Sequence, residues 1–236
     1  MKNRSLLLGA SAWLMTTLCF GQVGQIARQL GLRSQLSDTK ISSALKQALQ
    51  LGAEQSVKLT GRPDGYFANP DIKILMPNNL RSLERGLRLI GYGPKVDDFV
   101  LSMNRAAESA APAARKIFLD AIAAMTIDDA RAILSGGDTA ATNYFKDKTT
   151  PQLTAAFQPT VERTMAKNGV SRQYNALTAQ YKSIPFAKNQ DLDISHYVVS
   201  KALDGLFYQL GQEERKIRKD PAAQTTNLLR EVFGRR

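Results

Sequence analysis

Apolar residues recur at intervals of three and four positions along almost the whole chain, a spacing typical of amphipathic α-helices. The first such helix is predicted to begin at Asp38, which can cap it, and to end near Gly61. Further helices are predicted to begin near Leu80, Val96, Pro112, Thr126, Asp138, Thr150, Tyr174, Asp191 or Asp193, and Asp220. No internal repeat of fixed period is present. The pattern therefore predicts a single all-α domain over residues 36–236, with about eight to ten helices.

One stretch near residues 66–77 lacks the helical pattern. It follows Arg62-Pro63-Asp64-Gly65, a strong turn signal because proline presets one backbone dihedral angle and glycine accepts a positive φ. Ile72-Lys73-Ile74-Leu75 has the composition of a short strand, but a lone strand needs a partner. We therefore expect one short extended segment that crosses the domain near 66–77. Pairing of this segment with its copy in a dimer stays open.

Residues 1–21 have the organisation of a secretory signal peptide. Lys2 and Arg4 precede an apolar run, and small residues stand before the cleavage position. The run is too short, and too interrupted by serine and threonine, to form a comfortable membrane-spanning helix. We predict a signal peptide that is cleaved after Gly21, a polar linker over residues 22–35, and a periplasmic location.

Removal of this peptide leaves few residues for catalysis. Cys19 is the only cysteine and lies inside it, so the released chain has no thiol for catalysis, disulfides or metal binding. His196 is the only histidine; no Gly-x-Ser-x-Gly motif accompanies it, and a zinc site needs several histidine or cysteine ligands. Acidic pairs stand near predicted helix starts, where carboxylates cap helices. We therefore predict a protein without enzymatic activity, metal or other cofactor.

The charge of the chain directs attention to anionic partners. The sequence carries a net charge of +11, and loss of Lys2 and Arg4 leaves +9, from 30 basic and 21 acidic residues. Such an excess attracts anionic lipid headgroups, lipopolysaccharide or acidic polymers. Aromatic residues fall on apolar helix faces, which disfavours nucleic acid as a partner. The predicted partner is an anionic envelope component or a periplasmic protein, with peripheral membrane contact and a dimer left open.

The predicted turn carries the candidate binding residues. Arg62, Asp64 and Tyr66 stand in or next to it, where a rigid Pro-Gly frame can present side chains to a ligand or partner. Side chains in such turns reach solvent without disturbing the helices around them. We therefore predict that these residues bind a ligand or partner.

A second set of polar residues lies on predicted apolar helices. Asn104 and Glu108 are four positions apart on an alanine-rich helix, Arg105 neighbours Glu108, and Asp204 lies in the most apolar late helix. Charged groups near such stripes either line a cleft or cross-link helices as partly buried pairs. We predict the second role, so these residues form a structural polar network.

Five short motifs occur in a fixed order along the chain. They are GRPDGY at 61–66, NRAAE at 104–108, DARAIL at 129–134, KALDGLF at 201–207 and EERKIR at 213–218. Together they resemble the bacterial family known as domain of unknown function 4197, over residues 36–233. The resemblance implies a helical protein, exported or associated with the envelope of a Gram-negative bacterium, and it implies no reaction. Leu18 before Cys19 departs from the lipobox of lipid-anchored proteins, so a free periplasmic protein is expected.

These observations predict an exported, non-enzymatic envelope protein that binds a ligand or partner, such as lipid or an anionic envelope polymer. Two alternatives stay open, namely a structural or assembly partner of an envelope complex and a carboxylate-based hydrolase. A lipid bound to the purified protein would favour the ligand-binding protein. A co-purifying protein would favour the structural or assembly partner. An acidic pair facing one cleft would favour the hydrolase.

Overall fold

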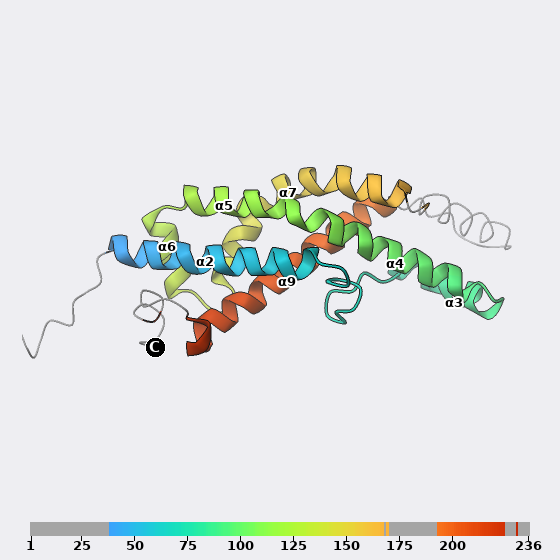
Figure 1. Cartoon of the computed structure of the whole chain (residues 1–236), viewed down its shortest axis with the longest axis horizontal. Coiled ribbons are helices and arrows are strands. Elements are labelled where there is room, and N and C mark those ends of the chain that lie inside the picture. The colour runs from blue at the N-terminus through green and yellow to red at the C-terminus, as the bar shows by residue number, and fades with distance from the viewer. Residues whose placement is uncertain (1–37, 168, 170–192, 225–229, 231–236) are drawn as a thin grey trace, which may run out of the picture. The chain divides into compact units, whose positions relative to one another are not determined.

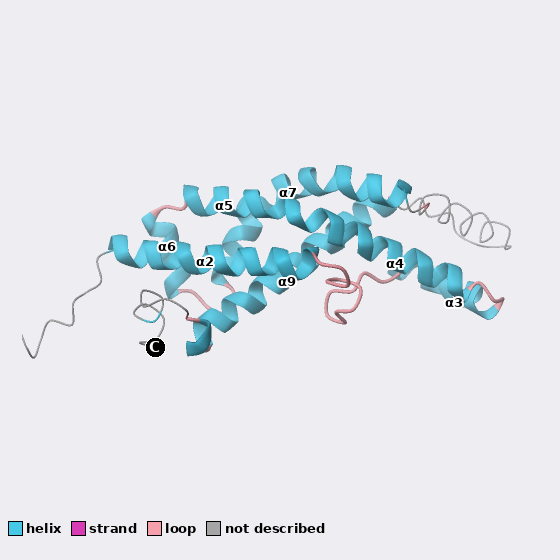
Figure 2. Ribbon diagram, viewed as in Figure 1, coloured by secondary structure: helices cyan, strands magenta, loops and turns pink. Residues whose placement is uncertain are grey.

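The computed structural model describes residues 38–167, 169, 193–224 and 230, which belong to one compact unit (Figure 1). The predicted signal peptide and linker lie outside the described residues, and so does the helix predicted near Tyr174. Within the described ranges there is no strand (Figure 2), so the domain is all-α as predicted. The predicted break after Gly61 is also present, because residues 62–77 form turns and extended backbone.

Seven stretches of this part of the chain are α-helices. They are α2 (Asp38–Gly61), α3 (Arg81–Leu89), α4 (Gly93–Ala110), α5 (Ala114–Ala124), α6 (Ile127–Ser135), α7 (Ala140–Lys167) and α9 (Ile194–Lys219). Short 3-10 helices adjoin them, namely η1 (Asn78–Leu80), η2 (Ala111–Ala113) and η3 (Pro221–Ala223). Two of these connect their neighbours directly, since η1 leads into α3 and η2 joins α4 to α5.

Helix α9 lies at the centre of the packing, because α2, α4 and α7 all contact it (Figure 1). Helices α5 and α6 pack against α2 and α7. The core between these helices contains four completely buried phenylalanines, Phe99, Phe118, Phe145 and Phe157. The rings of Phe118 and Phe145 meet edge to face, with their centroids 5.0 Å apart, a favoured aromatic geometry.

One predicted helix boundary is wrong. The sequence predicts separate helices from Asp138 and from Thr150, whereas the structure has one helix, α7, that runs through Pro151 and Pro159. Its buried positions continue across both prolines at a spacing of four, namely Phe145, Thr149, Leu153, Phe157, Val161 and Met165. Packing of this stripe outweighs the helix-breaking tendency of proline. The described residues therefore form fewer α-helices than the eight to ten predicted.

A carboxylate from α9 caps the start of α7. Asp138 was predicted to cap this helix but instead pairs with Lys219. The cap is Glu214, which accepts hydrogen bonds from the backbone N–H groups of Ala141 and Thr142, both at 2.9 Å. These amides have no partner within the helix, and the helix dipole favours a negative charge at this end.

Arg218 balances the charge of this buried carboxylate. Its guanidinium contacts Glu214 Oε1 at 2.8 Å and also donates to the carbonyl of Ile133, near the end of α6, at 2.8 Å. The side chains of Glu214 and Arg218 are only 6% and 8% exposed. Opposite charges thus lie against the start of α7 and the end of α6, which fixes α9 between these two helices.

We expect Glu214→Gln to destabilise the fold strongly, because it leaves the guanidinium of Arg218 buried without its counter-charge. The loss in unfolding free energy should be about 3 kcal/mol. Asp120→Asn is the matched control, since Asp120 pairs with Lys116 on the surface, where such pairs contribute about 1 kcal/mol or less. Chemical denaturation of both variants is the measurement. Equal losses would show that the buried pair has no special role.

Candidate binding site in the 62–77 segment

The 62–77 segment is held against α4 by the carboxylate of Glu108. Its Oε1 accepts hydrogen bonds from the backbone N–H groups of Tyr66 and Phe67, both at 3.1 Å. Tyr66 is completely buried and Glu108 nearly so. A buried turn would otherwise leave these amides without acceptors, at a cost of about 1–3 kcal/mol each. Glu108 therefore makes it possible for a non-helical turn to enter the core.

Arg105 links Glu108 to the turn itself. One guanidinium nitrogen contacts Glu108 Oε2 at 2.6 Å, and the other contacts Asp64 Oδ1 at 2.7 Å. The hydrogen bond to Glu108, together with the one to Asp64, raises the pKa of the Arg105 guanidinium above its ordinary value. Asp64 has a φ of 62°, a left-handed conformation that aspartate tolerates better than most residues. The ion pair helps to hold the turn in this conformation.

Asn104 fixes the extended part of the segment. Its side-chain amide accepts from the backbone N–H of Ile74 at 2.9 Å and donates to the Ile74 carbonyl at 2.8 Å. This reciprocal pair imitates the contact between two strands, and it occupies both backbone groups of Ile74. Those groups are therefore engaged within the protein and are not available for pairing with a second copy.

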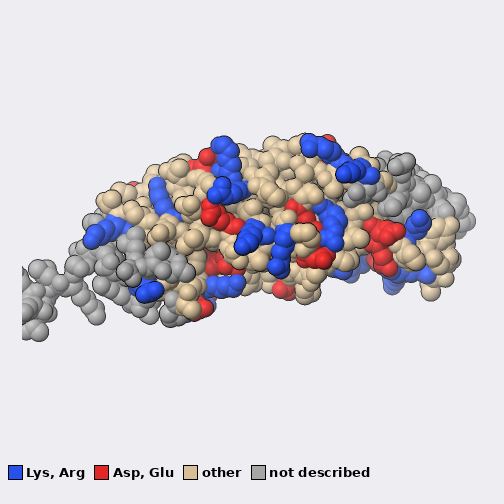
Figure 3. Space-filling view, in the orientation of Figure 1, with Lys and Arg blue, Asp and Glu red and all other residues tan. Residues whose placement is uncertain are grey.

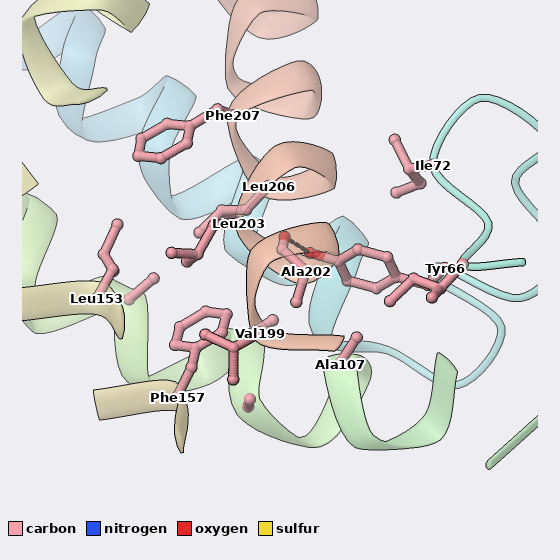
Figure 4. Close-up of a cluster of buried hydrophobic side chains, with 14 of the residues drawn as sticks. Tyr66, Ile72, Ala107, Leu153, Phe157, Val199, Ala202, Leu203, Leu206 and Phe207 are labelled. Carbon is pink, nitrogen blue, oxygen red and sulfur yellow. Dashed lines mark hydrogen bonds between the residues drawn. The ribbon is translucent and has the colours of Figure 1, made fainter. Parts of the chain in front are cut away.

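Tyr66 anchors the segment to α9. Its ring points from the turn towards α9, and its hydroxyl donates to the carbonyl of Ala202 at 2.6 Å (Figure 4). Burial, with the nearby charge of Glu108 adding to it, raises the pKa of this hydroxyl far above its ordinary value. Gly205 makes room for the ring, because a Cβ atom there would lie 2.5 Å from Tyr66 Cε1. Tyr66 thus joins the segment to the central helix.

A polar hollow of about 300 Å³ opens beside this anchored turn. We call it the turn pocket, and its lining residues are Leu59, Arg62, Asp64, Gly65, Ala68, Asn69, Pro70 and Gln209. They come from the end of α2, from the turn and from the middle of α9. Arg62 is exposed and forms no ion pair with any other residue that the structure describes. Its five N–H donors are therefore available to an anion.

The predicted binding residues have different surroundings. Arg62 and Asp64 both line the turn pocket, although Asp64 is already paired with Arg105. Tyr66 does not fit the predicted contact with a ligand, because it is completely buried and its hydroxyl is bound to Ala202. Its role in the structure is that of an anchor.

The predicted polar network divides in the same way. Asn104, Arg105 and Glu108 lie together and hold the 62–77 segment. Asp204 lies apart from them, because its exposed carboxylate pairs with Lys201 on the surface of α9 at 2.9 Å. The prediction that placed Asp204 in this network is therefore wrong: its neighbour Gly205, and not Asp204, faces the core.

Two polar lining residues, Asn69 and Gln209, were missed by sequence reasoning. The side-chain amides of Asn69 and Gln209 add hydrogen-bonding groups to the turn pocket. Asn69 precedes Pro70, a common turn dipeptide, so its position in a turn was recognisable. Gln209 interrupts the apolar run of α9 between Phe207 and Leu210, and that interruption was the available signal.

The turn pocket offers a cation and amides but a single carboxylate. Hydrolysis of a glycosidic bond by carboxylates commonly uses two, facing one another across the bond. Asp64 is the one acidic residue in the lining, and its carboxylate already forms an ion pair with Arg105. No cluster of three potential metal-ligating side chains occurs among the described residues. The chemistry of the lining suits binding of an anion better than acid–base catalysis.

Gly205→Ala should destabilise the protein, because the added methyl group collides with the ring that anchors the segment. Overpacking of this kind costs about 1–3 kcal/mol. The adjacent Asp204→Asn is the matched control, since the Asp204 side chain is 56% exposed and its loss should matter little. Thermal melts of the two variants provide the comparison. A lower melting temperature for Asp204→Asn than for Gly205→Ala would contradict this account.

Sequence comparison assigns the chain to a family. Its residues 35–234 match the profile of DUF4197, which is described as a protein of unknown function. No curated protein and no solved structure matched the chain. Among the described helices, none is long and apolar enough to cross a membrane. Because the match covers nearly its whole length, this protein belongs to the DUF4197 family.

Proposed function

We propose that this is an exported envelope protein that binds an anionic ligand in the turn pocket and catalyses no reaction. The observation that carries the proposal is the position of Arg62, an exposed cation without an ion-pair partner among the described residues, at a polar hollow of about 300 Å³. The turn that carries it is fixed to α4 through Asp64 and Glu108. Because the backbone of this turn is already held, binding through Arg62 costs less conformational entropy than it would on a loose loop.

The lining of the turn pocket favours a ligand that combines negative charge with hydroxyl groups. Arg62 can bind a phosphate or carboxylate through two parallel hydrogen bonds. Each amide is partly engaged within the protein, because Asn69 Oδ1 accepts from the Asp71 N–H at 3.1 Å and Gln209 Nε2 donates to Glu213 Oε1 at 3.3 Å. Their remaining donors and acceptors suit sugar hydroxyls, which both donate and accept. Phosphorylated or acidic envelope glycans have both kinds of group. The proposed ligand is therefore the anionic sugar portion of an envelope polymer.

A lipid acyl chain fits the interior less well. A second hollow, an apolar crevice between α2 and α9, is lined by residues such as Leu49, Gly52 and Ile217. Its free volume is about 20 Å³, which is room for a single water molecule. An acyl chain cannot enter this crevice without movement of the helices. Of these two hollows, the turn pocket is the one with room for part of a ligand.

The charge of the whole protein supports an anionic ligand in a different way. Lysines and arginines are interspersed with acidic residues over the face shown in Figure 3, without forming one broad basic patch. The net charge, +9 once residues 1–21 are removed, still creates a positive potential that attracts anions from a distance. This attraction is unspecific, so the specificity of binding must come from a defined site such as the turn pocket.

Arg62→Gln should weaken binding of an anionic glycan about tenfold or more, because it removes charge-assisted hydrogen bonds. The probe is the phosphorylated core oligosaccharide of lipopolysaccharide, freed of its lipid part, and titration calorimetry measures its affinity. Lys58→Gln is the matched control, since Lys58 is an exposed cation of the same helix end outside the pocket. It should bind as the unchanged protein does.

Three outcomes would contradict the proposal. The unchanged protein would fail to bind the oligosaccharide, Arg62→Gln would bind it equally well, or the two variants would lose the same affinity. The last result would mean that net charge alone drives binding. Melting temperatures of both variants should stay close to that of the unchanged protein, because neither side chain packs in the core.

Export is the second part of the proposal and rests on the pattern of residues 1–21. When the full chain is expressed in a Gram-negative host, cleavage after Gly21 should release a periplasmic protein without a lipid anchor. Sequencing of the mature N-terminus checks this, and the first residue should be Gln22. A mature chain that begins at a lipid-modified Cys19, or one that keeps Met1, would contradict the prediction.

A further inference from the structure

The turn between α3 and α4 lies at one end of the helical unit (Figure 1), and its large apolar side chains are exposed. Leu89 is 88% exposed, Ile90 66% and Tyr92 39%. Ile90 lies beyond the buried stripe of α3, because the helix ends at Leu89 and Gly91 turns the chain with a φ of 89°. Clustered apolar side chains on a surface are typical of interaction sites. We call residues 89–94 the hairpin tip.

Three backbone N–H groups of the hairpin tip are already hydrogen-bonded within the protein. The N–H groups of Ile90, Gly91 and Tyr92 donate to the carbonyls of Gly86, Arg88 and Leu87, respectively. Just beyond the tip, the Lys95 N–H donates to the carbonyl of Tyr92. The N···O distances are 2.9–3.3 Å. Pro94 has no N–H group. Backbone N–H groups that lack partners make entry into an apolar medium very costly. These amides of the hairpin tip therefore do not oppose such entry.

Basic side chains surround the apolar ones. Arg81 and Arg85 precede Leu89 at intervals of four, so the three share one face of α3. Lys95 follows in the first turn of α4. All three cations are exposed, and none forms an ion pair with another residue in the described part of the chain. An apolar end flanked by cations matches the layers of an anionic membrane surface, where acyl chains lie beneath phosphates.

An ion-pair network also connects the two helices of the hairpin. Arg88 contacts Glu84 on its own helix at 3.0 Å and Asp97 on α4 at 2.7 Å, which ties the two helices together. Two carboxylates thus face the single charge of Arg88, while Arg81, Arg85 and Lys95 pair with no carboxylate in the described part of the chain. The network links the backbone of the tip to α4 before any contact with a partner, which reduces the entropy lost on binding.

We propose that the hairpin tip inserts into the surface of an anionic lipid membrane. Leu89 and Ile90 enter the upper part of the acyl layer, while Arg81 and Arg85 extend their heads to the phosphates. Tyr92 occupies the interface, where its ring and hydroxyl suit the mixed surroundings. The contact is peripheral and reversible, and it is separate from the turn pocket.

A second copy of the chain is the less suitable occupant. Helix α3 packs mainly on α4 and η1, so the tip is a narrow end and not a broad face. A stable protein interface buries about 1,200 Å² or more in total, which three side chains at a narrow end do not supply. A lipid surface has no such requirement, because it closes around whatever enters it.

A single tryptophan can report the insertion. Trp13 is the only tryptophan, so Trp13→Phe with Leu89→Trp leaves one reporter at the hairpin tip. The matched control is Trp13→Phe with Ile127→Trp, at an exposed apolar position on α6. Each full-length variant is mixed with vesicles of phosphatidylglycerol and phosphatidylcholine. Emission from position 89 should move to shorter wavelength and be quenched by brominated lipid, and emission from position 127 should do neither.

A further variant tests the role of charge. It adds Arg81→Gln and Arg85→Gln to the protein that carries its single tryptophan at position 89. These changes should raise about tenfold the lipid concentration that is needed for half of the vesicle-induced shift. Circular dichroism should show unchanged helicity. The proposal is overturned if position 89 does not respond, if both positions respond equally, or if neutralising the arginines has no effect. A shift at position 89 that grows with protein concentration without vesicles would assign the tip to a second copy. None of these outcomes bears on the turn pocket, whose probe contains no lipid.

Discussion

The buried carboxylate of Glu108 is the interaction on which the arrangement around the turn pocket depends. It satisfies two backbone amides of a turn that has no helix or strand to do so, and Arg105 compensates its charge. Buried backbone groups must be paired for a fold to be stable. With Tyr66 and Phe67 held in this way, the ring of Tyr66 reaches Ala202 on α9, and Arg62 is left at the surface.

The same device occurs a second time in the molecule. Glu214 accepts hydrogen bonds from two backbone amides at the start of α7, and Arg218, four residues later, balances its negative charge. In both clusters a helix supplies a carboxylate with an arginine three or four positions away, and the pair holds a different part of the chain. Two of the motifs that carry the family resemblance, NRAAE at 104–108 and EERKIR at 213–218, contain these pairs. These charged motif residues therefore have a structural role.

Local features of the sequence were sufficient to predict some elements. Thr126 and Asp129 form a complete capping box at the start of α6, and the turn after Gly61 follows from its proline and glycine. Features that depend on distant contacts were not predictable in this way. The continuation of α7 through Pro151 depends on packing along its buried face, and its cap comes from α9.

The candidate site shows the same division. Arg62 and Asp64 could be selected because a turn exposes its polar residues, and both line the turn pocket. The burial of Tyr66 could not be predicted, because it requires Gly205 from a helix far along the sequence. The contribution of Gln209 to the pocket depends on the same packing of α9 beside the turn.

Hydrogen exchange at the backbone amides of Tyr66 and Phe67 tests the central claim most directly. If Glu108 holds them in the core, both amides should exchange only when the whole domain unfolds, at rates similar to those of the central helices, although neither residue lies in a helix. Nuclear magnetic resonance resolves the two amides individually. Exchange at the rate of an exposed loop amide, such as that of Leu75, would contradict the account, because the turn would then open without the rest of the fold.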